Sequence, residues 1–103
     1  MLSAASARKG HLMDLDEIRV KIDSIDVEIV TLLAKRADLV SAAGKLKKNE
    51  EGVRDPKRAE QVIEKVKAHA VTARLDPSIA ESVYRTIISC FIRRELKEFN
   101  TRR

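Results

Sequence analysis

Three basic residues in the first half of the chain occupy positions that bear on chemistry. The apolar spacing 29, 32, 36, 39 puts Arg36 on an apolar stripe, where a guanidinium is costly unless it meets an anion. Lys47 follows eleven residues later, close to three helical turns, so we expect both on one face of a helix. Arg19 points about 100° away from Arg36 around the same helix. If these cations converge on one ligand, Arg19 has to reach a site built mainly by another subunit.

A fourth cation, Arg58, falls in the first turn of a later predicted helix, where the positive helix end disfavours it. Guanidinium groups bind carboxylates in bidentate fashion. Together the four cations suit a small molecule with more than one carboxylate. Taken singly, Arg36 could instead form a structural salt bridge or extend its charge to solvent, and Arg58 could be a solvated surface residue.

Glu95 is the lone acid in the run from Arg93 to Lys97 and lies four residues after Phe91, so the two share a side of a helix. One interpretation is an exposed acid that pairs with neighbouring cations. The other is a carboxyl held protonated as a hydrogen-bond donor inside a site.

The elements that position these residues are helices. Apolar residues recur with 3-4 spacing from Asp14 to about Leu46, and the polar run 48–52 ends this pattern. At ~1.5 Å per residue the helix would be roughly 50 Å long, too long for a compact domain with a radius of gyration near ~13 Å. We therefore expect a homodimer with the long helices side by side; the alternative is a chain that lies against a larger protein. The stripe comprises Leu15, Ile18, Ile22, Ile25, Ile29, Leu32, Leu39, Ala43 and Leu46.

Asp-Pro pairs open two further helices. Asp55 is expected to cap one with Pro56 at its first position, and Asp76–Pro77 repeats this signal. The expected inward faces are Ala59, Val62, Ile63, Val66 and Ala70, then Ile79, Val83, Ile87, Cys90 or Phe91, and Leu96. The predicted fold class is all-α, with three helices, a very long first one and a dimer formed through it.

Composition agrees with a helical domain. The chain has 103 residues, 44% apolar, with 3 Gly, 2 Pro and 3% aromatics, which disfavours sandwiches and barrels. We expect one domain over 14–103 after a flexible extension, 1–13. No apolar run is long enough for a membrane span. A single cysteine, Cys90, suits the cytoplasm and excludes a cysteine-based metal cluster, and we expect neither metal nor cofactor.

In combination, the chain resembles the all-helical (class II) chorismate mutase family from about Leu15 to Leu96. The match consists of five ordered blocks: Ile18-Arg19-x-x-Ile22-Asp23-x-Ile25-Asp26, Leu32-Leu33-Ala34-Lys35-Arg36, Gly44-Lys45-Leu46-Lys47, Val53-Arg54-Asp55-Pro56-x-Arg58, and Leu75-Asp76. The resemblance implies an intertwined dimer with two identical sites, each receiving one arginine from the partner chain. It also implies the rearrangement of chorismate to prephenate on the route to phenylalanine and tyrosine, without a cofactor.

By that resemblance, Arg36 and the partner's Arg19 grip the two substrate carboxylates and Arg58 adds a contact. The start of the second helix near Asp55 faces the ring hydroxyl. Lys47 and Glu95 would flank the ether oxygen, with Glu95 protonated because a carboxylate would repel the developing negative charge.

The sequence departs from the commonest family pattern at Glu95, where many members have Gln, and at Ala59 and Phe91. Ala59 replaces a Glu that contacts the ring hydroxyl in many members, and Phe91 replaces a small polar residue found in some. Related scaffolds serve as isochorismate pyruvate lyase and as 4-amino-4-deoxychorismate mutase, and the lyase is similar at Ala59 and Phe91. These activities therefore remain alternatives.

A net charge of +5 and a basic C-terminus leave one alternative of another class, a helical nucleic-acid-binding or interaction module. The scarcity of aromatic residues leaves little for base stacking, and no helix-turn-helix signature is visible. Cations spaced along an apolar stripe suit a pocket better than a phosphate backbone, so we expect no nucleic-acid partner.

Overall fold

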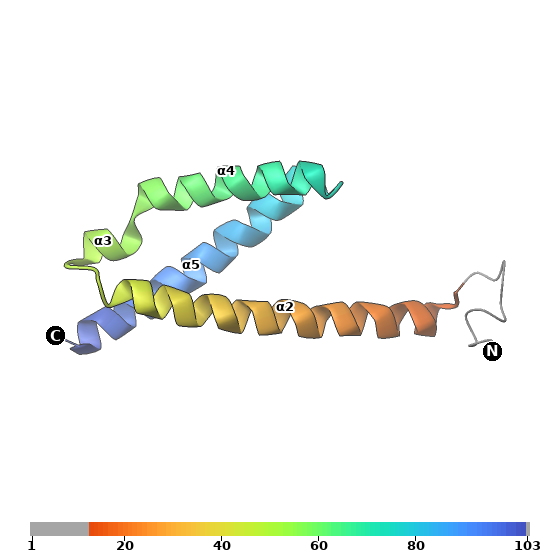
Figure 1. Ribbon diagram of the computed structural model, residues 1–103, viewed down its shortest axis with the longest axis horizontal. Coiled ribbons are helices and arrows are strands. Elements are labelled where there is room, and N and C mark those ends of the chain that lie inside the picture. Colours follow the sequence, from red (N-terminus) through yellow and green to blue (C-terminus); the bar gives the residue numbers. More distant parts are fainter. Residues whose placement is uncertain (1–12, 103) are drawn as a thin grey trace. The chain divides into compact units, whose positions relative to one another are not determined.

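The computed structural model describes residues 13–102, and every element in that range is a helix, as predicted. Figure 1 shows the four elements in order: α2 (Leu15–Gly44), α3 (Glu50–Arg54), α4 (Pro56–Thr72) and α5 (Pro77–Arg102). The predicted extension, apart from Met13, lies outside the described residues.

α2 starts with a reciprocal capping box. The Asp14 carboxylate accepts a hydrogen bond from the Glu17 N–H at 2.9 Å, and Glu17 Oε1 accepts from the Asp14 N–H at 3.1 Å. This arrangement satisfies N–H groups that have no partner inside the helix. Asp14 thus caps the helix.

The end of α2 differs from the prediction, because the helix ends at Gly44 and not near Leu46. The Leu46 and Lys47 N–H groups bond to the carbonyls of Ala43 and Gly44, at 3.0 and 3.1 Å, which tightens the chain into a turn. Lys47 therefore lies beyond the helix whose periodicity placed it on the same face as Arg36.

The polar run after α2 holds a short helix, α3, that sequence analysis missed. Asn49 caps it by accepting a hydrogen bond from the Gly52 N–H at 2.7 Å. Glu50 and Glu51 occupy its first turn, where acids are favoured. An Asn followed by two acidic residues is typical of a helix N-terminus. The helix has only five residues, however, and its polar sequence also resembles that of a linker.

Asp55 joins α3 to α4 in the way the Asp-Pro pair predicted. It has the left-handed conformation, φ 35° and ψ 65°, which ends α3. Its side chain accepts a hydrogen bond from the Arg58 N–H at 3.2 Å and so caps α4, with Pro56 at the first position. Asp76 likewise accepts from the Ser78 N–H at 2.9 Å at the start of α5.

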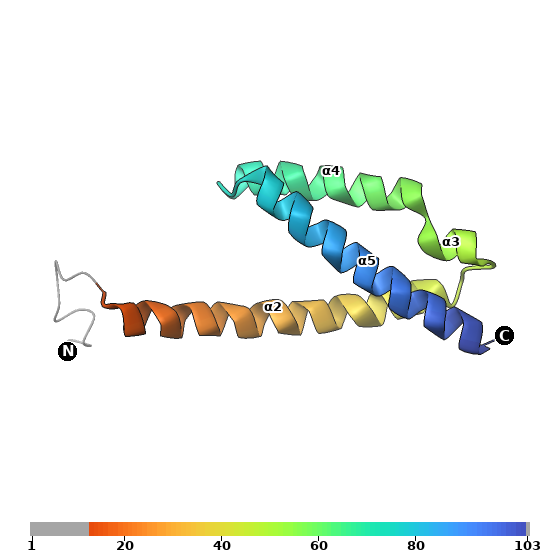
Figure 2. The ribbon, with the colours of Figure 1, turned by 180° about the vertical axis from the view of Figure 1, so that it is seen from behind.

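Residues from Arg36 onward form one compact unit. Within it α4 and α5 pack against each other and α3 packs against α5, as Figure 2 shows. The most buried side chain is Ile63, 1% exposed, and the other buried apolar residues are Val53, Ala70, Ala80 and Phe99. The predicted inward face of α4 is confirmed, because all five of its residues are buried or half-buried.

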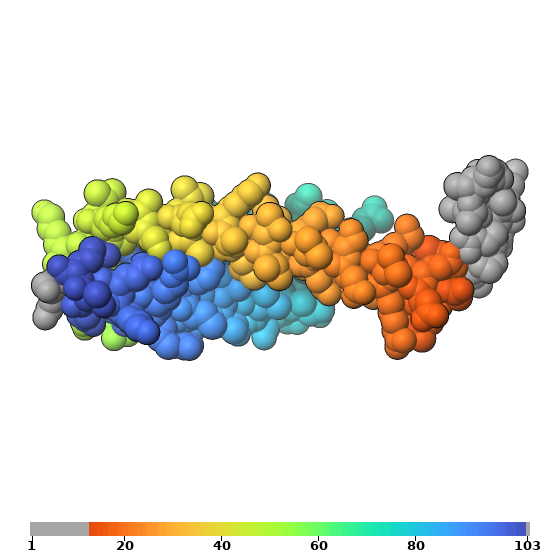
Figure 3. All heavy atoms as spheres, turned by 90° about the horizontal axis from the view of Figure 1, so that it is seen from below, coloured from red at the N-terminus to blue at the C-terminus, as the bar shows by residue number. Residues whose placement is uncertain are grey.

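The end of α2 contacts α5 in the same unit. The Ser41 hydroxyl donates to the Glu98 carboxylate at 3.1 Å, and Figure 3 shows α5, in blue, beside this part of α2, in yellow. On α5 the predicted inward face is wrong at Ile79, Val83 and Cys90, which are exposed. Packing uses the neighbouring side of α5, which carries the buried Ala80, Glu95 and Phe99.

The unit that ends at Lys35 consists, in its described part, of the first two thirds of α2. Its apolar stripe is exposed in the single chain, from 39% at Ile18 to 61% at Leu32. Isoleucines at positions 22, 25 and 29 are each about half exposed. A regular apolar stripe left open to water is typical of a helix that packs against another chain.

Candidate active site

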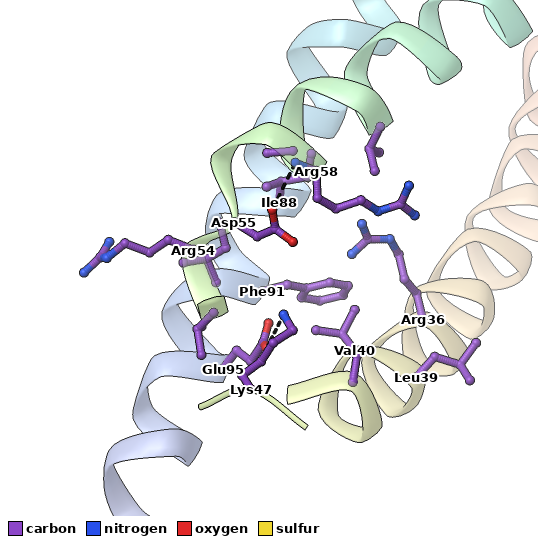
Figure 4. Close-up of a pocket in the computed structure, with 15 residues that line it drawn as sticks. Arg36, Leu39, Val40, Lys47, Arg54, Asp55, Arg58, Ile88, Phe91 and Glu95 are labelled. Atoms are coloured by element: carbon purple, nitrogen blue, oxygen red, sulfur yellow. Dashed lines mark hydrogen bonds and ion pairs between the residues drawn. The ribbon is translucent and has the colours of Figure 1, made fainter. Parts of the chain in front are cut away.

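A cavity of about 330 Å³ lies within the compact unit, a size typical of small-molecule sites. Its walls come from the end of α2, the turn at Lys47, the α3–α4 junction and α5, as Figure 4 shows. Five of the six predicted site residues line it: Arg36, Lys47, Asp55, Arg58 and Glu95. The sixth, Arg19, is an exposed residue of α2 in the other unit and does not line the cavity.

Lys47 reaches the cavity from the turn that follows α2. Its ammonium donates to the Gly52 carbonyl at 3.1 Å and lies 3.4 Å from Glu95 Oε2. An ammonium has three N–H groups, so within the described chain one is left for a ligand. Lys47 and Arg36 both line this cavity, although the helical spacing that suggested their proximity does not hold.

Glu95 is buried, 6% exposed, and faces Lys47 from α5. Its carboxylate pairs with the Lys47 ammonium and not with the cations that flank it on its own helix. The interpretation of Glu95 as an exposed surface acid is therefore wrong. A buried carboxyl that lines a cavity beside an ammonium is a polar group able to contact a bound ligand.

Arg36 and Arg58 point toward one another across the cavity in Figure 4. The Arg36 guanidinium lies 4.9 Å from the centroid of the Phe91 ring and 6.0 Å from that of Tyr84, within the range of cation–π attraction. Between Met13 and Arg102 no carboxylate pairs with either arginine side chain. Two adjacent guanidinium groups without acid partners in the described chain are able to bind carboxylates.

The side chains of Arg54 and Asp55, both at the cavity, differ in their orientation and in their hydrogen bonds. The Arg54 side chain turns away from the cavity in Figure 4. One Asp55 oxygen accepts the hydrogen bond that caps α4, and in the described chain the other takes no such bond. Asp55 is therefore able to accept from a ligand hydroxyl without releasing its helix.

The rest of the lining is mostly apolar, and sequence analysis did not single these residues out. They are Leu39, Val40, Ala43, Val53, Val62, Ile88 and Ile92. Several stand three or four positions from Arg36 or Glu95, and that spacing was the available signal. Ala59 and Phe91, the two apolar departures from the family pattern, also line the cavity. The cavity thus combines an apolar wall with a few convergent polar groups.

The described residues contain no group of three or more His, Cys, Asp or Glu side chains placed to hold a metal ion. None of the helices described is long and apolar enough to cross a membrane.

Comparison with known proteins agrees with this geometry. The family model "Chorismate mutase type II" matches residues 18–96, a range that includes all six predicted site residues. The chain is also 32% identical over 83 residues to the isochorismate pyruvate lyase of Pseudomonas aeruginosa, across 81% of this chain and 82% of the relative. The protein belongs to the type II chorismate mutase family, which confirms the predicted resemblance.

Proposed function

We propose that the protein is a chorismate mutase, which converts chorismate to prephenate in the cytoplasm for phenylalanine and tyrosine synthesis. The observation that carries the proposal is the cavity in which Arg36 and Arg58 have no acid partner among the described residues, while half-buried Lys47 and buried Glu95 form a pair in the same walls. Chorismate has two carboxylates and an ether oxygen, so it matches both features.

The reaction breaks the ether C–O bond while a C–C bond forms within the same molecule. It needs no nucleophile and no net proton transfer, so the protein has to hold the substrate in a compact conformer and stabilise negative charge on the ether oxygen. Arg36 would hold one carboxylate, and Arg58 would add a contact to the substrate. The free N–H of Lys47 and a protonated Glu95 would donate to the ether oxygen, and Asp55 would accept from the ring hydroxyl.

We further propose that the site is completed in a homodimer by Arg19 of the partner subunit. Support comes from the exposed apolar stripe of α2, which a second copy would cover, and from the absence of Arg19 among the residues that line the cavity. Arg19 would then hold the second carboxylate opposite Arg36.

Mixing two inactive variants tests this sharing. In a mixed dimer of Arg19→Ala and Arg36→Ala chains, one site has both arginines and the other has neither. Random exchange in a two-fold dimer should restore about a quarter of wild-type activity. If both arginines act from one chain, each site keeps a lesion and mixing restores nothing. The matched control is each variant mixed with itself.

The pH dependence of turnover on chorismate tests the role of Glu95. Activity should fall as pH rises, because the neutral acid that donates to the ether oxygen is lost on ionisation. Glu95→Gln keeps a neutral donor at every pH and should flatten the profile. A wild-type profile that is flat from acidic to alkaline pH contradicts this role.

Isochorismate pyruvate lyase is a second candidate, supported by the P. aeruginosa relative and by the apolar residues Ala59 and Phe91 in the cavity. It would use the same cations to break the same kind of ether bond, with release of pyruvate and salicylate. Chorismate, isochorismate and 4-amino-4-deoxychorismate, presented separately, distinguish the candidates by which substrate disappears and which product forms. Thermal stabilisation by DNA but not by a dicarboxylate transition-state mimic would contradict all three.

A further inference from the structure

Gly44, the last residue of α2, is buried against the Glu95 side chain. A Cβ at this position would lie 2.9 Å from Glu95 Oε2, 3.0 Å from its Cγ and 3.3 Å from its Cδ. Such distances are too short for ordinary van der Waals contact, so the flexible Glu95 side chain would have to move. By contrast, the nearest atom to a Cβ at Gly52 is Asn49 Oδ1 at 3.4 Å. Of these two glycines, only Gly44 leaves space that the Glu95 carboxyl uses.

The carbonyl of Gly44 fixes the turn that carries Lys47. It accepts a hydrogen bond from the Lys47 N–H at 3.1 Å and a second from the Arg102 guanidinium at 3.0 Å. Arg102 lies in the last turn of α5 and does not line the cavity. The Arg102 guanidinium also stacks over the Phe99 ring, 5.7 Å from its centroid. The end of α5 thus holds the end of α2 from outside the site.

We propose that Gly44 is a positioning residue for the Lys47–Glu95 pair. Its missing side chain lets the Glu95 carboxyl lie against the end of α2, while its carbonyl holds the Lys47 backbone one turn away. These two contacts meet at one residue and together set the 3.4 Å separation of Lys47 Nζ and Glu95 Oε2. The effect of Gly44 on the position of the Glu95 carboxyl is argued from these contacts alone. The expected effect on turnover rests on the proposed function.

Gly44→Ala tests the proposal in the full-length chain. Alanine suits a helical backbone and the Glu95 side chain that must move is flexible, so the fold should be retained, which a single cooperative urea transition would show. Because the Glu95 carboxyl is displaced, kcat for the active substrate should fall about 10- to 100-fold. KM should change less than about threefold, because Arg36 and Arg58 are untouched.

A double-mutant cycle separates positioning from a general structural effect. In a Glu95→Ala background there is no carboxyl to displace, so adding Gly44→Ala should change kcat by less than about twofold. An equal loss from Gly44→Ala in both backgrounds would overturn the proposal.

A readout that needs no turnover distinguishes this proposal from the proposed function. The ¹³C resonance of the Glu95 carboxyl should shift in Gly44→Ala, and a crystal structure of the variant should show the contact with Lys47 Nζ broken. Lys45→Met is the control, because Lys45 is exposed, directly follows Gly44 and does not line the cavity, and it should leave that resonance in place. An unmoved Glu95 carboxyl in Gly44→Ala overturns the proposal. Absence of wild-type turnover on all three substrates would instead reject the proposed function and leave this test valid.

Discussion

Two parts of one helix, α2, have different surroundings. Between Leu15 and Lys35 the apolar stripe is exposed in the single chain. From Arg36 to Gly44 one side of the same helix contacts α5, through Ser41 with Glu98 and Gly44 with Arg102, while Leu39 on the stripe stays 72% exposed. A continuous apolar pattern along a helix therefore does not show which segment of that helix packs against other helices of the same chain.

The two arginines of α2 differ in the same way. Arg36 lies over the Phe91 ring and faces Arg58, so its guanidinium is held where a ligand would bind. Arg19 is exposed, and its proposed role depends on a second copy of the chain. The fold therefore organises Arg36, whereas the position of Arg19 in a site depends on the proposed dimer.

The largest expected effect on turnover concerns the cavity in the compact unit, to which Lys47 contributes. Lys47→Met should lower kcat about 10²- to 10³-fold, because it removes a fixed donor to the ether oxygen while keeping the length of the side chain. Steady-state turnover measures this loss. Lys45→Met is the matched control, since Lys45 is exposed, close in sequence and absent from the lining of the cavity. Equal losses in the two variants would contradict the assigned role of Lys47.

A charged residue on the exposed apolar stripe of α2 tests the proposed role of that stripe in dimer formation. Ile25→Lys should convert the dimer to a monomer and lower activity at least about tenfold, because burying an unpaired ammonium opposes association and Arg19 of the partner subunit is lost. Light scattering and turnover at the same protein concentration measure both effects. Val27→Lys lies about 200° around the helix and should keep the dimer. A fully active Ile25→Lys monomer would show that the cavity needs no second chain.

A smaller effect is expected from the rings that hold Arg36. Phe91→Leu should raise KM about two- to fivefold, because the cation–π contact that orients the guanidinium is lost. Tyr84→Leu should raise it less, since that ring centroid lies at 6.0 Å instead of 4.9 Å. Michaelis–Menten curves give both values. A larger rise in KM for Tyr84→Leu than for Phe91→Leu would contradict the conclusion that Phe91 is the main ring contact of Arg36.

The smallest effect concerns the surface between α4 and α5. Arg85 bonds to Glu60 at 2.9 and 3.1 Å and to Glu81 at 2.9 Å, and these hydrogen bonds lower the pKa of both carboxyls from 4.5. Their contribution to stability is complete above pH 4.5 and is lost as pH falls through the lower folded-state pKa values. Arg85→Ala should therefore lower the urea midpoint slightly at pH 7.

The difference between wild type and Arg85→Ala should shrink as the solution is acidified below pH 4.5. Exposed ion pairs contribute little, so dimer formation and turnover should stay unchanged at pH 7. A difference that grows on acidification would contradict the assigned cause of the two pKa shifts.

Sequence patterns predicted the elements that carry strong local signals. Asp55 and Asp76 cap helices where the Asp-Pro pairs placed them, and the inward face of α4 is confirmed. Sequence patterns did not predict elements with weak local signals, and they did not predict which of two similar faces of a helix is buried. The short helix α3 has only five residues, and Cys90, expected in the core, is exposed because α5 turns a neighbouring side toward α4.

The sequence by itself determined the all-helical class and the family, and it named five charged residues that line the cavity, because periodicity, caps and charge placement are local properties. Only the tertiary structure decided that Glu95 is buried beside Lys47, that Arg36 faces Arg58, and that Gly44 leaves space for a carboxyl 51 positions later in the chain. Those contacts join segments far apart in sequence. Their geometry depends on where α2 ends and how α5 packs against it, which no local pattern specifies.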